Sequence, residues 1–297
     1  MEKISKLKEK YFPYLMCTPA IVLFTVLIIV PLFTGLIISF FKWDGYGAMS
    51  FNAGENYLFV FQDEVYKTAI GNTFVYAIAV TIFKNLIALV LAFILVKKFP
   101  LKNFFRSGIY MPVMMSYIVI GILWTWIFNP TFGLLNSFLN LVGLDSLIKG
   151  WLSDPSCAMW SVIAVDVWKW IGYHMVLYIA GLQGISQDYY EAAEIDGASA
   201  WQKFKNITIP LLNPTIVVNV MMSITGGLVS NYDIVHIMTD GGPFHATEVS
   251  ATYIMRTAFT YGNMGKANAM TMITFAIAFI FGFIQLYFMT RKESEEN

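Results

Sequence analysis

Six long stretches of the chain consist almost entirely of apolar residues, and the polar residues gather between them. A membrane-spanning helix needs about 20 predominantly apolar residues. The stretches are apolar around most of a helix circumference and do not alternate as the strands of a membrane barrel do. The pattern therefore predicts six transmembrane helices, at Tyr14–Phe41, Ile70–Val96, Ser107–Phe128, Ala158–Leu182, Pro210–Ser230 and Ala267–Met289.

The composition narrows the class of protein further. Hydrophobic residues make up 57% of the 297 residues and charged residues only 13%, where soluble domains carry about 25% charged residues. The 19 basic and 19 acidic residues cancel, so the chain offers no basic surface for nucleic acid. We expect an all-α integral membrane protein, a single transmembrane domain over residues 1–297, whose surroundings are a lipid bilayer and whose partners include no nucleic acid.

Basic residues are unevenly distributed between the two sides of the predicted membrane. Loops rich in Lys and Arg stay in the cytoplasm. With the N-terminus inside, the inside segments hold Lys3, Lys6, Lys8, Lys10, Lys97, Lys98, Lys102, Arg106, Lys203, Lys205, Arg291 and Lys292. The outside segments hold only Lys42, Lys67, Lys149, Arg256 and Lys266. We therefore expect both termini to be cytoplasmic.

The two long outside loops carry structural signals of their own. Residues Asn129–Cys157 contain apolar side chains at helical spacing, which predicts a short helix lying on the membrane surface or on a partner. The later loop contains Asp240-Gly-Gly-Pro243, a combination typical of a turn.

The segment between the fourth and fifth spans, residues 183–209, is polar and reads as two short helices joined by a sharp turn. Asp188, with a glutamate three residues later, predicts a capping box at the start of the first helix. Gly197 stands where a helix end needs a left-handed residue. Ser199 and Gln202 repeat the capping box for the second helix.

Two interpretations of this segment remain open on composition alone. Its small residues Ala192 and Ala193 are flanked by Glu191, Glu194 and Asp196, so another surface can approach closely and meet acidic groups. An element of this kind fits a groove in a cytoplasmic partner. The alternative is an amphipathic loop that folds back on the membrane surface.

Several runs of the sequence resemble one family. EAAEIDGASAWQKFKNITIPLLNP, residues 191–214, is similar to the EAA loop of ABC-importer permeases. WIFNPTFGLLN and MTDGGPFHATEV resemble stretches of the maltose-type, binding-protein-dependent carbohydrate-uptake permeases. Ser186-Gln187 departs from that family, in which a proline is usual after this turn. The resemblance extends over nearly the whole chain.

The resemblance implies a type I ABC importer permease fold in the cytoplasmic (inner) membrane of a bacterial-type cell. The EAA loop of this family is a coupling helix that inserts into a cytoplasmic ATPase. The contact would fall on Glu191, Ala192, Ala193, Asp196 and Gly197. The implied partners are a second homologous permease, two ATPase subunits and an extracytoplasmic solute-binding protein. ATP and Mg would be used by the ATPase, and this chain would bind no cofactor.

The chain itself offers no nucleotide or metal site. A P-loop needs a glycine, a Gly-Lys pair and a hydroxyl residue at fixed spacing. The nearest match, Gly265-Lys266, has Thr260 in place of the first glycine and Ala267 in place of the hydroxyl residue. The three histidines are scattered without metal-ligand spacing. We therefore expect a transport subunit without enzymatic activity.

The fourth span carries the polar residues of greatest interest. Asp166, Lys169, Trp170 and Tyr173 are spaced so that they share one stripe of the helix. Ionisable groups inside a span mark transport pathways by default, and we expect the aspartate and lysine, three residues apart, to neutralise each other in part. Aromatic faces beside donors and acceptors suit a sugar. The alternative is an ion pair that only joins helices. The resemblance adds Tyr117, Gly227 and Asn231 to the expected sugar-binding positions.

The leading hypothesis is the permease subunit of an ATP-driven importer of a sugar or oligosaccharide. A glycerol-phosphate-type solute is an alternative within the same family. A second class, an ion-coupled secondary transporter acting alone, would use Asp166 as its ion site. That class has no need of an element like residues 183–209 that docks an ATPase.

Overall fold

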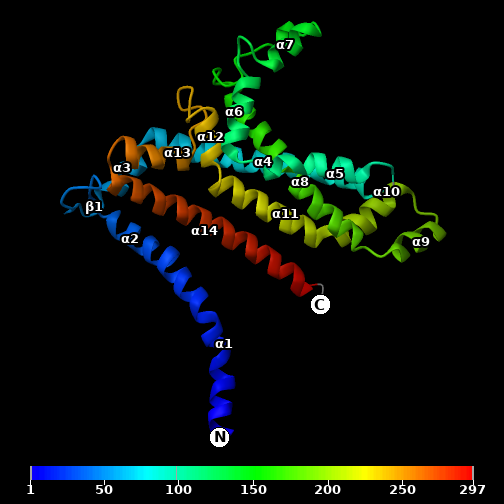
Figure 1. Ribbon diagram of the computed structural model, residues 1–297, viewed down its shortest axis with the longest axis horizontal. Coiled ribbons are helices and arrows are strands. Elements are labelled where there is room, and N and C mark those ends of the chain that lie inside the picture. Colours follow the sequence, from blue (N-terminus) through cyan, green and yellow to red (C-terminus); the bar gives the residue numbers. More distant parts are fainter. Residues whose placement is uncertain (1, 98, 296–297) are drawn as a thin grey trace. The chain divides into compact units, whose positions relative to one another are not determined.

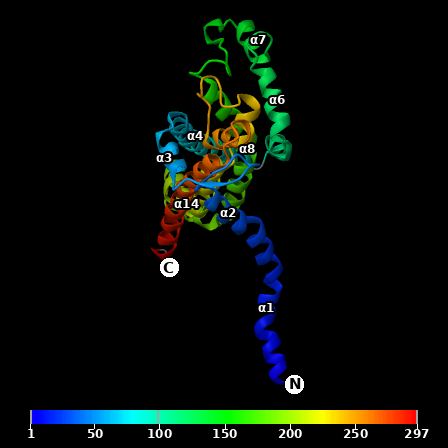
Figure 2. The same cartoon turned by 90° about the vertical axis from the view of Figure 1, so that its left-hand side faces the viewer.

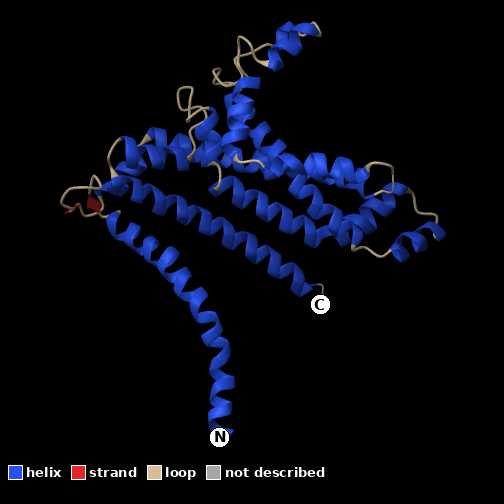
Figure 3. Cartoon of the chain, viewed as in Figure 1, coloured by secondary structure: helices blue, strands red, loops and turns tan. Residues whose placement is uncertain are grey.

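The computed structural model describes residues 2–97 and 99–295, and most of them are helical (Figure 3). Lys98, one of the predicted cytoplasmic basic residues, lies outside the described residues, as do residue 1 and residues 296–297 of the predicted domain. The chain divides into two compact units, residues 1–63 with 254–275 and residues 64–253 with 276–297. The single domain stays a prediction.

Within the described residues, five helices are long and apolar enough to span a membrane. A sixth candidate is a pair of helices, Lys102–Met114 and Tyr117–Ile127, bent by 102°. The predicted all-helical membrane fold is therefore confirmed, with five spans or six if the bent pair is one span. The five single helices are Tyr14–Ile38, Glu64–Val96, Ala158–Gln183, Ala200–Val229 and Met264–Gln285.

The predicted third span, Ser107–Phe128, is wrong as one continuous helix. Its first part ends in a 3₁₀ turn, Met111–Met114, that contains Pro112. Proline has no N–H to donate and restricts the residue before it. Ser116 then caps a new helix, since its Oγ accepts a hydrogen bond from the Val119 N–H at 3.4 Å. Hydropathy does not register this break because the residues at the break, Met111–Met115, are themselves apolar.

The first unit begins with the most exposed of the five spans. After that span, the chain makes a short antiparallel hairpin in which Phe41 pairs with Phe51. The Asn56 amide stabilises the helix–hairpin junction by donating to the carbonyl oxygens of Ser39 and Phe41, both at 2.9 Å. The helices and strands of this part are α1 (Glu2–Phe24), a π-helical turn (Thr25–Ile29), α2 (Val30–Ile38), β1 (Phe41–Lys42), β2 (Ser50–Phe51) and α3 (Glu55–Gln62).

The second unit is a helical bundle built around α4 (Glu64–Val96), α8 (Ala158–Gln183) and α11 (Ile209–Val229), which lie side by side (Figures 1 and 2). The predicted short helix in the first outside loop is present as α7. The other helices of this unit are α5 (Lys102–Tyr110), α6 (Tyr117–Ile127), α7 (Leu134–Leu141), a 3₁₀ turn (Asp145–Leu147), α9 (Gln187–Ile195), α10 (Ala200–Lys203), a π-helical turn (Phe204–Thr208) and α12 (Tyr232–Met238). The helices α13 (Ser250–Met255) and α14 (Met264–Glu295) pass from one unit into the other, and a π-helical turn (Arg256–Thr260) lies in the first unit.

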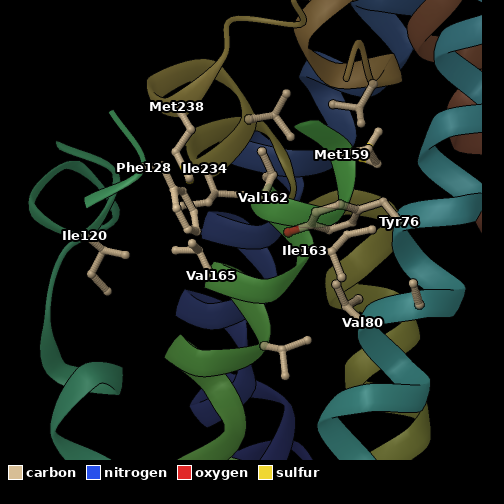
Figure 4. Packing of buried hydrophobic residues seen from close by; sticks show 14 residues of the cluster. Tyr76, Val80, Ile120, Phe128, Met159, Val162, Ile163, Val165, Ile234 and Met238 are labelled. Carbon is tan, nitrogen blue, oxygen red and sulfur yellow. The ribbon is translucent and has the colours of Figure 1, made fainter. Parts of the chain in front are cut away.

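The main apolar core of the second unit gathers side chains from α4, α6, α8 and α12 (Figure 4). Tyr76 and Val80 of α4 meet Ile163 of α8, and all three are almost completely buried. Ile120 of α6 and Ile234 of α12 close the other side of this core. The packing of these four helices determines the direction in which the polar side chains beside the core point.

Candidate functional site

A cavity of about 370 Å³ lies between α4, α6, α8 and α11. Four of the residues predicted to bind substrate, Tyr117, Asp166, Trp170 and Tyr173, line it, and three others do not. Its size is within the range of ligand pockets, about 300–1,000 Å³. The lining residues are Lys84, Tyr117, Asp166, Trp170, Tyr173, His174, Met222, Ser223, Gly226 and Ser230.

A buried ion pair forms one wall of the cavity. Lys84 Nζ lies 2.6 Å from Asp166 Oδ2, and the two side chains are only 6% and 4% exposed. The other carboxylate oxygen, Oδ1, accepts a hydrogen bond from the Tyr117 hydroxyl at 3.1 Å. Trp170 Nε1 donates in turn to that hydroxyl at 2.6 Å. The pair connects α4 to α8, and the hydrogen bonds extend it to α6.

The partner of Asp166 differs from the one expected on sequence. Lys169, three residues along the same helix, does not pair with it and does not line the cavity. Its ammonium group donates instead to the carbonyl oxygens of Met115 at 2.6 Å, Val113 at 3.3 Å and Pro112 at 3.4 Å. These carbonyls belong to the break between α5 and α6, where helical partners are missing. Lys169 therefore stabilises the bend.

We expect Lys169→Met to loosen the bend between α5 and α6, because three carbonyl groups lose a charged donor. Hydrogen bonds to charged groups contribute about 1.5–3 kcal/mol each, and we expect a loss of stability of about 2 kcal/mol. Spin labels at Phe105 and Ile122, both partly exposed, report the separation of α5 and α6. The expected result is a broader distance distribution than in the parent protein.

The matched control for this variant is Lys67→Met. Lys67 forms an exposed ion pair with Glu64 at 2.7 Å on α4, and pairs of this kind contribute at most about 1 kcal/mol. The control should leave the α5–α6 distances unchanged. An unchanged distribution in Lys169→Met would contradict the role of Lys169 at the bend.

A second group of polar side chains joins α4, α8 and α11 beside the ion pair. His174 Nδ1 lies 2.8 Å from Asn219 Oδ1, and its Nε2 lies 3.3 Å from Ser223 Oγ. Ser223 also accepts from the Asn85 amide at 3.0 Å, and Asn85 accepts from the Tyr178 hydroxyl at 2.6 Å. Such interhelical hydrogen bonds contribute about 1 kcal/mol each in membranes. Only His174 and Ser223 of this group line the cavity.

Gly227 and Asn231 are placed differently from the other predicted binding residues. A Cβ added at Gly227 would lie 2.6 Å from the Cα of Ala77, so glycine permits close contact between α11 and α4. Asn231 is buried and donates to the Gly227 carbonyl at 2.9 Å. Neither lines the cavity, where Gly226 and Ser230 stand instead. A role of these residues in binding stays a prediction.

Sequence reasoning did not place Lys84 at the site, although a signal was present. A lysine in the middle of an apolar span requires a partner of opposite charge, and Asp166 is the acidic residue available in another span. His174, an ionisable residue inside a span, carried the same kind of signal. Met222, Gly226 and Ser230 carried none, because apolar and small residues of these types are common in any span.

The segment between α8 and α11 has the predicted turn at Gly197. Gly197 has a φ of +75°, and a Cβ added there would have nothing within 4 Å. Its N–H donates to the Glu194 carbonyl at 3.1 Å, and the next N–H, of Ala198, donates to the Ala193 carbonyl at 2.9 Å. These two bonds form a Schellman motif, which ends α9 and satisfies its last carbonyls.

The capping predictions for this segment are confirmed at one end and wrong at the other. Ser199 and Gln202 form the expected capping box of α10, with bonds of 3.3 and 2.7 Å. The cap of α9 is Ser186 and not Asp188, since Ser186 Oγ accepts from the Asp188 N–H at 3.3 Å. The helix begins one residue before Asp188, which therefore lies in its first turn.

An ion pair joins the two helices on either side of the turn. Lys203 Nζ contacts Glu194 Oε1 at 2.6 Å. This hydrogen bond, together with the lysine charge, lowers the pKa of the Glu194 carboxyl. The contact is therefore complete at neutral pH and is lost on acidification through that lowered pKa. α9 has no buried residue, and Tyr189 and Ile195 expose apolar side chains.

The second helix of the segment is not separate from the fifth span. α10 continues through the π-helical turn Phe204–Thr208 into α11, giving one helix over Ala200–Val229. The wider turn precedes Pro210, and the Ile209 N–H donates to the Phe204 carbonyl five residues back. A π-helical turn of this kind absorbs the mismatch that proline creates in a helix.

The relationship of the chain to known proteins agrees with this arrangement. A family model described as the inner membrane component of binding-protein-dependent transport systems matches residues 84–294. The match includes the lining residues on α4, α6, α8 and α11 together with the segment around Gly197. The chain belongs to this family. It is a non-catalytic, multi-pass permease subunit of the inner membrane, and a transporter of this kind works with a binding protein and an ATPase.

Individual relatives match this permease from end to end. The probable ABC transporter permease protein YurN of Bacillus subtilis (strain 168) is 37% identical over 290 residues, which cover 96% of this chain and 99% of that protein. The probable starch degradation products transport system permease protein AmyD of Thermoanaerobacterium thermosulfurigenes is 29% identical, covering 97% and 99%. A solved bacterial ABC transporter involved in alginate import shares the fold, with a TM-score of 0.84, 23% identity, and 98% and 99% of the two chains covered.

Proposed function

We propose that this permease moves a sugar or oligosaccharide across the cytoplasmic membrane, with ATP and Mg used by a separate ATPase. The observation that carries the proposal is the cavity, in which Tyr117, Trp170 and Tyr173 stand beside the Lys84–Asp166 pair. The aromatic faces can stack on the apolar face of a sugar ring, and the polar groups match its hydroxyls as donors and acceptors. The likeness to AmyD, which is named for starch degradation products, supports the same substrate class.

The predicted binding residues act on the solute in different ways, because only some of them line the cavity. Tyr117, Asp166, Trp170 and Tyr173 contact the solute directly in this proposal, because their side chains line the cavity. Lys169 acts on the solute only through the bend that it stabilises. Gly227 lets α11 lie close against α4 and so maintains the wall of the cavity, and Asn231 bonds back to the Gly227 carbonyl at the end of α11.

The ATPase binds, in this proposal, at the turn after α9. Glu191, Ala192, Asp196 and Gly197 are exposed, and Ala193 is partly exposed. The side chains of the two alanines are short, so a partner surface can approach the helix backbone closely. The Schellman motif and the Glu194–Lys203 pair keep this exposed element in one shape, which lowers the entropy cost of binding.

The remaining partners follow from the incomplete wall of the cavity. Residues of four helices line it, and a closed passage needs more wall than one chain supplies. A second homologous permease completes the passage, and each permease binds one of two ATPase subunits. Both termini lie in the cytoplasm, and the solute-binding protein docks on the opposite side, at the outside loops around Asn129–Cys157 and Asp240–Lys266.

The energy source separates an ATP-driven importer from an ion-coupled carrier. Uptake is measured in cells whose proton gradient has been collapsed while ATP is maintained. The expected result is that uptake continues at a rate close to that of untreated cells. Uptake that stops under these conditions, and returns when a pH gradient is imposed without ATP, would support a carrier that uses Asp166 as its ion site.

A further inference from the structure

The fixed charges on the cavity wall cancel within the described residues. Lys84 and Asp166 are the charged side chains among the lining residues, and their charged atoms lie 2.6 Å apart. The part of the wall that this chain supplies therefore presents a dipole and no net charge to a solute. The field of such a contact pair falls off faster with distance than the field of a single ion.

Lys169 does not change this balance. Its ammonium group does not line the cavity. It lies 4.9 and 5.2 Å from the ring centroids of Tyr117 and Trp170, and three backbone carbonyl oxygens surround it at 2.6–3.4 Å. Those carbonyls use the donor capacity of the ammonium group, which has three hydrogens. An anionic solute in the cavity would have to compete with them for the only nearby cation that has no carboxylate partner among the described residues.

Both ring nitrogens of His174 make their hydrogen bonds with uncharged groups. The Asn219 amide donates to the Thr215 carbonyl at 3.0 Å, which leaves Asn219 Oδ1 as the acceptor for a proton on Nδ1. Nε2 lies 3.3 Å from the Ser223 hydroxyl, which donates to the Asn219 carbonyl oxygen at 2.8 Å. The histidine is therefore part of the interhelical network.

Resting on the proposed sugar function, we infer that the cavity selects an uncharged polyhydroxyl solute and rejects phosphorylated or uronic-acid solutes. An anion would leave water for a site with two adjacent opposite charges and no unpaired donor cation. The cost of desolvating an ion is met only where an opposite charge or several donors receive it. A neutral sugar does not incur this desolvation cost. Its hydroxyls can bond to Asp166 and to the polar groups of Tyr117, Trp170 and Tyr173.

The charge balance can be measured without knowing the solute. In the complete importer with Cys17→Ser and Cys157→Ser, a single cysteine is introduced at Ser230, an exposed residue of the cavity wall. Its reaction rates with sulfonatoethyl and trimethylammonioethyl methanethiosulfonate are compared with those of a free thiol. A neutral cavity gives a rate ratio within about threefold of the free thiol. A net positive charge within a few ångströms raises the ratio in favour of the anionic reagent by about tenfold, equivalent to about 1.4 kcal/mol.

Met222 supplies the calibration, since it lines the cavity and is 45% exposed. Met222→Lys should shift the ratio about tenfold toward the anionic reagent, and Met222→Gln should leave it unchanged.

Uptake by the parent importer is then tested with radiolabelled maltotriose, trigalacturonate and sn-glycerol 3-phosphate, together with wider panels of neutral and anionic sugars. Transport of neutral sugars alone, with a ratio near that of the free thiol, supports the inference.

Two other results would overturn it, and they differ from a failure of the sugar function. A rate ratio in the parent that favours the anionic reagent as strongly as in Met222→Lys would overturn the inferred selection for uncharged solutes. Uptake of a uronate or a phosphorylated sugar would do the same. Both results leave a carbohydrate importer in place. ATP-driven uptake of a solute that is not a carbohydrate removes the proposed function itself, whatever the ratio.

Discussion

Replacing Gly197 with valine should reduce ATP-driven uptake and substrate-stimulated ATP hydrolysis at least tenfold. Gly197 has a φ of +75°, a conformation that costs an L residue roughly 1–2 kcal/mol and a β-branched residue more. The Schellman motif that closes α9 then opens, and the proposed ATPase-binding element loses its single shape. Transport and ATPase rates of the reconstituted importer measure both effects, and copurification of the ATPase measures docking.

The control is Gly197→Asn. Nothing lies within 4 Å of a side-chain carbon at this position, so side-chain volume is not at issue there. Asparagine tolerates the left-handed conformation far better than valine. Asparagine should therefore keep most of the activity that valine loses. Equal activity in the two variants and the parent would contradict the coupling role of the turn.

Removing the carboxylate of Asp166 should have the largest effect on the cavity. Asp166→Ala leaves the Lys84 ammonium buried without its partner at 2.6 Å and deprives the Tyr117 hydroxyl of its acceptor. Breaking a buried pair on one side typically costs about 3–5 kcal/mol. We expect a large drop in thermal stability and uptake below a tenth of the parent rate, measured on the purified importer and in proteoliposomes.

A double variant separates stability from transport. Lys84→Met with Asp166→Asn removes both charges and keeps an amide oxygen that the Tyr117 hydroxyl can contact. Since no unpaired charge remains, most of the lost stability should return. If the pair also contacts solute, uptake stays low in this stable variant. Uptake at the parent rate would show that the pair only joins α4 to α8.

The parts of the structure that follow from local sequence were predictable. The turn at Gly197 and the capping box of Ser199 and Gln202 depend on residues within five positions of one another. The same local reasoning failed at Asp188 because Ser186, two residues earlier, is an equally good cap and takes the position. The membrane spans were predictable because an unbroken run of about 20 apolar residues is typical of a membrane-spanning helix.

The parts that depend on contacts between helices were not predictable from one sequence. Asp166 and Lys169 share a stripe of α8, yet the lysine bonds to the break in the third span and the aspartate to α4. The choice depends on which helices surround α8 and on a bend that hydropathy does not detect. Likewise, successive residues on a helix point about 100° apart, so the neighbours Gly226 and Gly227 lie on different sides of α11.

The unbroken path from α10 to α11 has a mechanical consequence. Met222 and Ser223 on the cavity wall belong to the same helix as Ala200, which follows the Gly197 turn. At 1.5 Å per residue, about 33 Å of continuous helix separates Ala200 from Met222. A tilt of about 5° about one end moves the other by about 3 Å over that length, comparable to the diameter of a water molecule. A small rotation applied in the cytoplasm would thus reach the binding chamber through this helix, and bending at the π-helical turn Phe204–Thr208 and at Pro214 would reduce the displacement.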